Sequence, residues 1–97
     1  MTGTTRSSER LDPRRRRLLF RSWHRGIREM DLILGRFADA HIATLSDADL
    51  DTYERLIELP DPDLLGWVTG EFQTPAELDT ALFRRLRDFH FIPRDPA

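Results

Sequence analysis

The amino-acid sequence predicts an all-α fold, a compact five-helix bundle-like single domain. Apolar residues recur at spacings of three and four along several stretches, which is the pattern of helices with one buried face. Asp-Pro or Thr-Pro pairs precede three of these stretches and mark helix starts. No segment alternates apolar and polar residues over a useful length, and no Asn-Gly or Asp-Gly pair marks a hairpin. We expect a disordered tail over residues 1–11, the five-helix domain over 12–92 and a frayed C-terminus over 93–97.

The first two helices are expected on either side of Gly26. Asp12 is the predicted N-cap of the first helix, with Pro13 at its first position. One apolar side of this helix is formed by Leu19, Phe20 and Trp23. The buried face of the second helix is formed by Met30, Ile33, Leu34, Phe37 and His41. We expect His41 at the edge of the core, and Gly35 to permit close packing of a neighbouring helix.

The third helix is expected to begin after Ser46, which forms a weak capping box with Asp49. Its packing face is formed by Leu50, Tyr53, Leu56 and Ile57. We expect Tyr53 to be half-buried. Pro60 should end the helix, because the residue before a proline avoids the α region.

The fourth helix is expected to repeat the Asp-Pro start, at Asp61 and Pro62. Gly70 is a natural residue to end it, because glycine readily adopts the left-handed conformation. We expect Trp67 to lie in the core, since a small domain needs its bulk.

The fifth helix has the clearest predicted start. Thr74 and Glu77 match a capping box, with Pro75 at the first helical position. Its packing face is formed by Leu78, Leu82, Leu86 and Phe89. Pro93 is expected to stop it.

Charge is distributed unevenly along the chain. Residues 1–30 hold nine arginines and three acidic residues, whereas residues 31–97 hold six arginines and fourteen acidic residues. The run Arg14–Arg17 could be a solvated face, match an acidic partner, or bind nucleic-acid phosphates. The net charge of -2 and the acidic body favour the first two over nucleic acid.

The sequence lacks signatures of catalysis and of metal or nucleotide binding. It has no cysteine and no glycine-rich phosphate loop, and its three histidines lack ligand spacing. The acidic pairs at 47–51 and 61–63 stand at expected helix starts, where they cap free N–H groups. We therefore expect no catalytic residue, no bound metal and no enzymatic activity. No apolar run approaches the length of a membrane span, so no membrane insertion is expected.

The segment Arg25-Gly26-Ile27-Arg28-Glu29 is the most informative part of the chain. A glycine in a helical context costs about 1 kcal/mol relative to alanine, so its presence requires a reason. One reason is a corner between two helices, and another is a surface where a partner approaches the backbone closely. Arg25 and Glu29 stand four residues apart and could also form an ordinary intrahelical pair.

This segment fits the Arg-Gly-x-x-Glu motif, and the chain resembles the small succinate dehydrogenase assembly factors. Residues 17–22 precede the motif, and residues 30–34 with Phe37 follow it, as in those proteins. Residues 61–70 resemble their Asp-Pro-Asp-Leu…Trp block. The resemblance covers residues 14–90. His24 is a small departure, since many relatives carry a basic residue there.

The resemblance implies a helical module that promotes covalent attachment of FAD to the flavoprotein subunit of succinate dehydrogenase, or alternatively of fumarate reductase. It implies no tightly bound cofactor, since the flavin belongs to the partner. We expect Arg25, Gly26, Glu29, Trp23 and Arg28 to contact this partner. The chain is expected to be a monomer in the cytoplasm, with the mitochondrial matrix as the alternative. The rival function is a small nucleic-acid-binding or antitoxin-type regulator that uses Arg14–Arg17.

Overall fold

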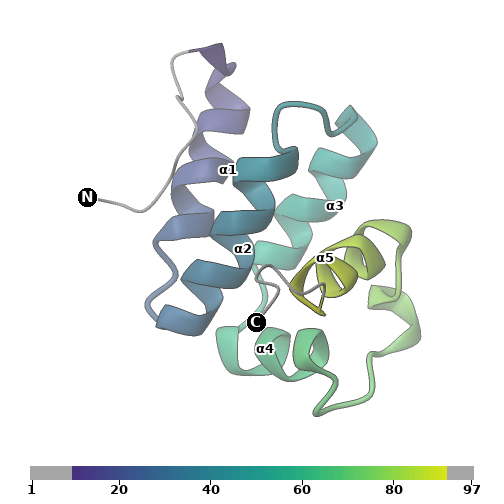
Figure 1. Ribbon diagram of the computed structural model, residues 1–97. Coiled ribbons are helices and arrows are strands. Elements are labelled where there is room, and N and C mark those ends of the chain that lie inside the picture. Colours follow the sequence, from purple (N-terminus) through teal and green to yellow (C-terminus); the bar gives the residue numbers. More distant parts are fainter. Residues whose placement is uncertain (1–9, 92–97) are drawn as a thin grey trace.

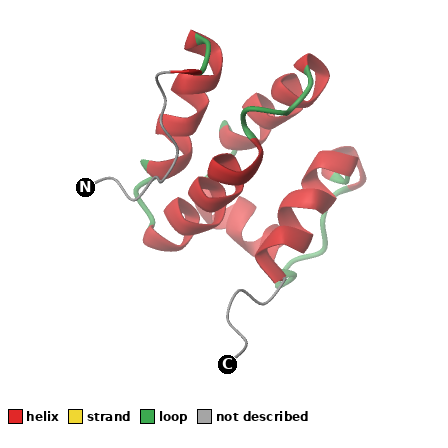
Figure 2. Cartoon of the chain, turned by 45° about the horizontal axis from the view of Figure 1, so that its top comes forward, coloured by secondary structure: helices red, strands yellow, loops and turns green. Residues whose placement is uncertain are grey.

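A computed structural model describes residues 10–91, apart from the side chains of His90 and Phe91. These residues form five α-helices and no strand, which confirms the predicted all-α class (Figure 2). The helices are α1 (Pro13–Trp23), α2 (Arg28–His41), α3 (Asp47–Ile57), α4 (Asp61–Thr69) and α5 (Ala81–Phe91), with a short 3₁₀ helix, η2 (Ala76–Leu78), before α5. The expected tail over 1–11 lies outside the described residues except at its end. There Leu11 is buried in the core, so the packed domain begins one residue earlier than predicted.

Helices α1, α2 and α3 stand next to one another, while α4 and α5 lie at one end of this group (Figure 1). The α1 helix packs against α2 and α3, and α2 also packs against α4 and α5. The core lies between all five helices. Its largest fully buried side chains are Tyr53, Phe37, Phe83, Leu18, Met30, Leu34, Ile42, Leu50, Ile57, Leu64, Leu86 and Val68.

The first and third helices begin as predicted. The carboxylate of Asp12 accepts a hydrogen bond from the backbone N–H of Arg15 at 3.2 Å, and Ser46 accepts one from the N–H of Asp49 at 3.1 Å. These side chains satisfy donors that have no partner within the helix. The prediction for Phe20 was wrong: this side chain is 61% exposed, because α1 turns Leu18, Leu19 and Ser22 inward instead.

Close packing at Gly35 is confirmed. The indole of Trp23 lies directly against this glycine, and a Cβ atom at position 35 would overlap the ring. The indole N–H donates to the carboxylate of Asp39 at 3.3 Å. A small residue at position 35 thus lets α1 and α2 approach and buries Trp23 to 8% exposure.

Tyr53 is fully buried, so the prediction of a half-buried side chain was wrong. Its hydroxyl lies 2.5 Å from the hydroxyl of Ser22, which is also buried and donates to the carbonyl of Leu18. A buried phenol requires such a partner, and no sequence pattern indicates that Ser22 supplies it. Burial raises the pKa of Tyr53 well above its usual value. Trp67 is only partly buried and packs at the edge of the core.

The start of the last helix was also predicted wrongly. Thr74 and Pro75 open only the single turn η2, and α5 begins at Ala81, where the Thr80 hydroxyl accepts from the N–H of Phe83 at 3.1 Å. The chain leaves the helical region at Asp79, whose carboxylate accepts instead from Arg84 at 2.8 Å. The end of α4 at Gly70 is confirmed, with a φ of 84°. The predicted stop at Pro93 lies outside the described residues.

Candidate functional site

Residues 24–27 form the bend between α1 and α2, and Gly26 is exposed within it. Gly26 has a φ of 102°, a conformation that L-amino acids with a side chain rarely adopt. A Cβ built at this position would meet no atom within 4 Å. The first expected reason therefore applies, because the backbone at this corner requires a glycine. The surface above Gly26 is open, and the close approach of a partner stays a prediction.

The Arg25 side chain turns into the molecule from this bend. Its guanidinium forms an ion pair with Asp61, with 2.7 Å between Nη2 and Oδ1, and its Nε donates to the same oxygen at 3.0 Å. The remaining donors reach the backbone carbonyls of Ile57 at 2.6 Å and Leu59 at 3.3 Å. Both charged side chains are nearly buried, at 10% and 12% exposure. Arg25 thus holds the bend against the turn between α3 and α4.

This arrangement corrects the predicted role of Asp61. The residue at the N-cap position of α4 is Pro60, which has no capping side chain, and Asp61 lies inside the first turn. Its carboxylate is used by Arg25 instead. A second carboxylate closes the bend from the other side, since Asp31 Oδ1 accepts from the backbone N–H of Arg25 at 2.6 Å. Two acids from α2 and α4 therefore fix one arginine.

Arg28 and Glu29 point outward at the start of α2. Both are exposed, and neither side chain has a hydrogen bond or ion pair within the part of the chain that the structure describes. The intrahelical pair between Arg25 and Glu29 that the spacing allowed does not form, because Arg25 binds Asp61. Glu29 is thus an available carboxylate four residues after Arg25, the arginine of its own motif, whose guanidinium is buried.

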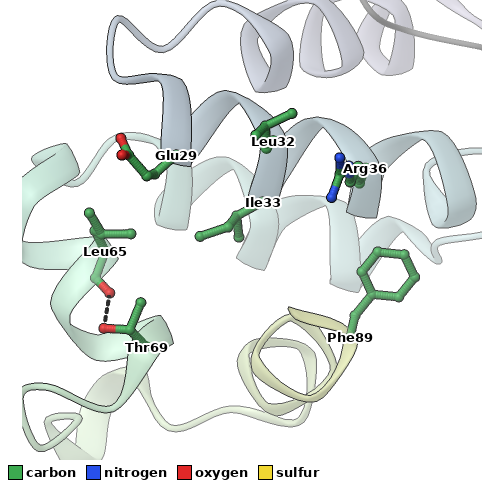
Figure 3. A pocket seen from close by; sticks show the side chains of 7 residues that line it. All are labelled: Glu29, Leu32, Ile33, Arg36, Leu65, Thr69 and Phe89. Atoms are coloured by element: carbon green, nitrogen blue, oxygen red, sulfur yellow. Dashed lines mark hydrogen bonds between the residues drawn. The ribbon is translucent and has the colours of Figure 1, made fainter. Parts of the chain in front are cut away.

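A groove opens beside Glu29, between α2, α4 and α5 (Figure 3). Its volume is about 230 Å³. The residues that line it are Glu29, Leu32, Ile33, Arg36, Leu65, Thr69 and Phe89. Four of these seven are apolar, and the two charged ones lie on α2. Glu29, two residues after the bend, is therefore part of the groove lining.

Comparison with known proteins identifies the family of this chain. The family model described as flavinator of succinate dehydrogenase matches residues 16–90, which include the bend, the groove and the Asp61 partner of Arg25. The chain belongs to this family.

Named relatives agree with this assignment. The chain is 39% identical over 80 residues to the FAD assembly factor SdhE of Acetobacter pasteurianus, covering 82% of this chain and 73% of that protein. It is 35% identical over 82 residues to the mitochondrial succinate dehydrogenase assembly factor 2 of Dictyostelium discoideum, covering 84% of this chain and 57% of that protein. The corresponding factor of Meyerozyma guilliermondii is 42% identical over 67 residues, or 69% of this chain. The chain thus spans only about half the length of these mitochondrial relatives. No solved structure matches it significantly.

The structure divides the five predicted contact residues of this flavinator-family chain into two groups. Gly26, Arg28 and Glu29 are exposed together at the bend and the start of α2. Arg25 and Trp23 point inward, where one fixes the bend and the other fills the space at Gly35. Direct contact with a partner stays a prediction for the first group, whereas the second group is placed to hold the surface in shape.

Two arginines of the basic run Arg14–Arg17 are engaged within the fold, and only Arg14 contacts the acidic helix α3. The Arg14 guanidinium donates to Glu54 at 2.9 Å and to Asp51 at 2.5 Å, and these carboxylates raise its pKa further. Arg15 donates to the carbonyls of Ile42 and Leu45 at 2.9 and 2.6 Å. These contacts use two of the four charges within the fold, whereas Arg16 and Arg17 are exposed and have no ion pair with any described residue.

Sequence reasoning missed the α4 and α5 walls of the groove, Leu65, Thr69 and Phe89. Their periodicity shows only that they share helix faces, and no sequence signal reports where three helices leave a gap. Across residues 10–91 no group of three histidine or acidic side chains could hold a metal ion, and no helix there is long and apolar enough to cross a membrane.

Proposed function

We propose that this protein binds the flavoprotein subunit of succinate dehydrogenase and promotes the covalent attachment of FAD to it. The observation that carries the proposal is the family match over residues 16–90 together with an open, solvent-exposed bend at the matching Arg-Gly-x-x-Glu segment. The names of its relatives, an FAD assembly factor and mitochondrial succinate dehydrogenase assembly factors, support it.

The action we propose is selective binding. A binder accelerates a reaction in its partner by favouring the partner conformation in which the reacting groups are aligned. Its effect is limited by the difference between its affinities for that conformation and for the others. Gly26 would let the partner backbone approach, while Glu29 would accept hydrogen bonds from a partner arginine or backbone N–H. The chain itself would hold no cofactor, and the bond would form within the flavoprotein.

Several narrower expectations belong to this proposal. The chain would act as a monomer and would not itself be an enzyme. Its compartment would be the one in which the flavoprotein matures, the cytoplasm of a bacterium or the mitochondrial matrix. Fumarate reductase, whose flavoprotein presents the same chemical problem, is the second candidate partner.

The test measures covalent flavin directly. The flavoprotein subunit is produced in a host that lacks its own factor, with and without this chain, and separated under denaturing conditions. In-gel flavin fluorescence then reports only the covalently bound flavin. We expect a clear rise in fluorescence per subunit when the chain is present; equal fluorescence in both samples refutes the proposal.

A further inference from the structure

The groove between α2, α4 and α5 is preformed and suited to an apolar group. Its walls come from three helices that pack directly on one another. Its volume is about 230 Å³. An engineered apolar cavity that binds benzene is smaller, with a volume of about 150 Å³. One aromatic or branched aliphatic side chain would therefore fit without rearrangement of the core.

Water is a poor occupant of this groove. Leu32, Leu65 and Phe89 supply half-buried apolar walls, with Ile33 at the base. The only hydroxyl, that of Thr69, already donates to the carbonyl of Leu65 at 2.9 Å. A water molecule needs two to four polar partners to be held well, so an apolar group can displace the solvent at little loss.

Two opposite charges mark the ends of the groove. Figure 3 shows Glu29 on the side of α4 and Arg36 on the side of α5. Both residues are exposed, and neither has an ion pair with any residue in the described range 10–91. Their positions on α2 differ by seven residues, or about 10 Å along the helix axis. The groove therefore has a polarity that an occupant can match.

We propose that this groove receives one apolar side chain of the flavoprotein subunit, carried on a segment with a basic residue beside Glu29 and an acidic residue beside Arg36. In an extended segment at about 3.3 Å per residue, every second side chain faces the same side. A basic, an apolar and an acidic residue at alternate positions, spanning about 13 Å, would therefore face Glu29, the groove and Arg36. The inference rests on the proposed function, because it names the partner. It adds a second contact to the one proposed at the bend, two residues before the groove residue Glu29.

An anchor of this kind has a definite role in binding. Apolar side chains that fill a pocket at the centre of an interface supply most of its affinity, while surrounding charges set orientation and association rate. The bend at Gly26 offers close backbone approach but no pocket. The groove supplies the missing pocket, and the charges at its ends fix the direction in which the partner segment lies.

The experiment blocks the groove and compares a matched site. Thr69→Phe fills the groove, whereas Thr52→Phe makes the same change at another half-buried helical threonine, whose hydroxyl also donates four residues back, to Ala48. Affinity for the purified flavoprotein subunit is measured by calorimetry, and circular dichroism reports folding. We expect Thr69→Phe to weaken binding by at least about tenfold, the loss typical of a blocked anchor site, and Thr52→Phe to bind as the wild type does.

A charge reversal at an exposed residue provides a second test of the groove, one that leaves the packing of the core unchanged. Arg36→Glu should weaken binding, and more strongly at low salt than at high salt, because the groove would then repel the acidic partner residue. Arg16→Glu is its control, since Arg16 is an exposed helical arginine whose side chain has no ion pair with any described residue. Comparison of Arg36→Glu with Arg16→Glu tests the groove proposal even if Thr69→Phe does not fold.

The outcomes separate this inference from the proposed function. If the wild type binds the flavoprotein and neither Thr69→Phe nor Arg36→Glu weakens it beyond its control, the groove proposal is overturned and the proposed function stands. If the wild type does not bind at all, both are overturned. If Thr69→Phe instead removes self-association seen by light scattering, a second copy of the chain occupies the groove, and the proposal is again overturned.

Discussion

Replacement of Gly26 separates the two reasons for a glycine at the bend. Its φ of 102° should cost any L-residue with a side chain about 1–2 kcal/mol of stability. Replacing glycine also makes the unfolded chain less flexible, which offsets about 0.4–1 kcal/mol of this cost. We expect Gly26→Ala to lose about 1 kcal/mol of stability, which lowers the Tm of a domain of this size by about 4–8 °C. Gly26→Arg should have nearly the same Tm, because no atom lies within 4 Å of the new Cβ.

The two variants should differ in function where they agree in stability. Thermal unfolding by circular dichroism gives the Tm, and calorimetry with the flavoprotein subunit, below both transitions, gives the affinity. Gly26→Ala should bind nearly as the wild type does, while Gly26→Arg should lose binding because its side chain occupies the space for the partner backbone. Equal loss of binding in both variants would mean that Gly26 serves geometry alone. A much lower Tm for Gly26→Arg than for Gly26→Ala would contradict the conclusion that the space above Gly26 is open.

Three further predictions follow from contacts inside the fold. Arg25→Ala should destabilise the protein by about 3 kcal/mol, because Asp61 is left as a nearly buried unpaired charge. Urea unfolding of Arg25→Ala, of Asp61→Ala and of the double variant should give a favourable coupling energy between the two side chains. Additive losses of stability would contradict the ion pair. Gly35→Ala should lower stability by about 1–3 kcal/mol through overlap with the Trp23 indole, and an unchanged urea midpoint would contradict that packing. Burial holds the pKa of His41 below its usual 6.5, so the unfolded chain binds a proton at this residue at higher pH than the folded chain does. The stability of the protein should therefore fall as the pH drops below about 6.5. The Tm measured from about pH 7 to 5.5 should decline less in His41→Gln than in the wild type, and parallel curves would contradict this role of His41.

The number and order of the helices could be predicted because local signals and periodicity agreed. Asp12 and Ser46 cap their helices in the predicted way, and Gly70 ends α4 in the left-handed conformation. At Thr74 and Pro75 the same kind of signal failed. A capping box stabilises a first turn, but whether that turn continues depends on the next residues, and here Asp79 leaves the helix and Thr80 supplies a new cap.

The candidate site was predictable only in part for a different physical reason. An exposed glycine beside charges is visible in the sequence, and Gly26 and Glu29 are indeed open to solvent. Which charge turns inward is decided by residues far away in the chain. Arg25 is drawn inward by Asp61, 36 positions later, and by the carbonyls of Ile57, at the end of α3, and Leu59, just after it. No local pattern could distinguish it from Arg28, which stays exposed.

The contact between Arg25 and Asp61 joins two blocks that are separate in the sequence. Along the chain, the Arg-Gly-x-x-Glu segment and the Asp-Pro-Asp block look like independent features. In the structure the first residue of one is bonded to the first residue of the other, so the bend and the start of α4 form a single unit. The same helix α4 then supplies Leu65 and Thr69 to the groove. A change at Asp61 would therefore shift both the bend and the groove, and we expect it to impair binding without touching the partner.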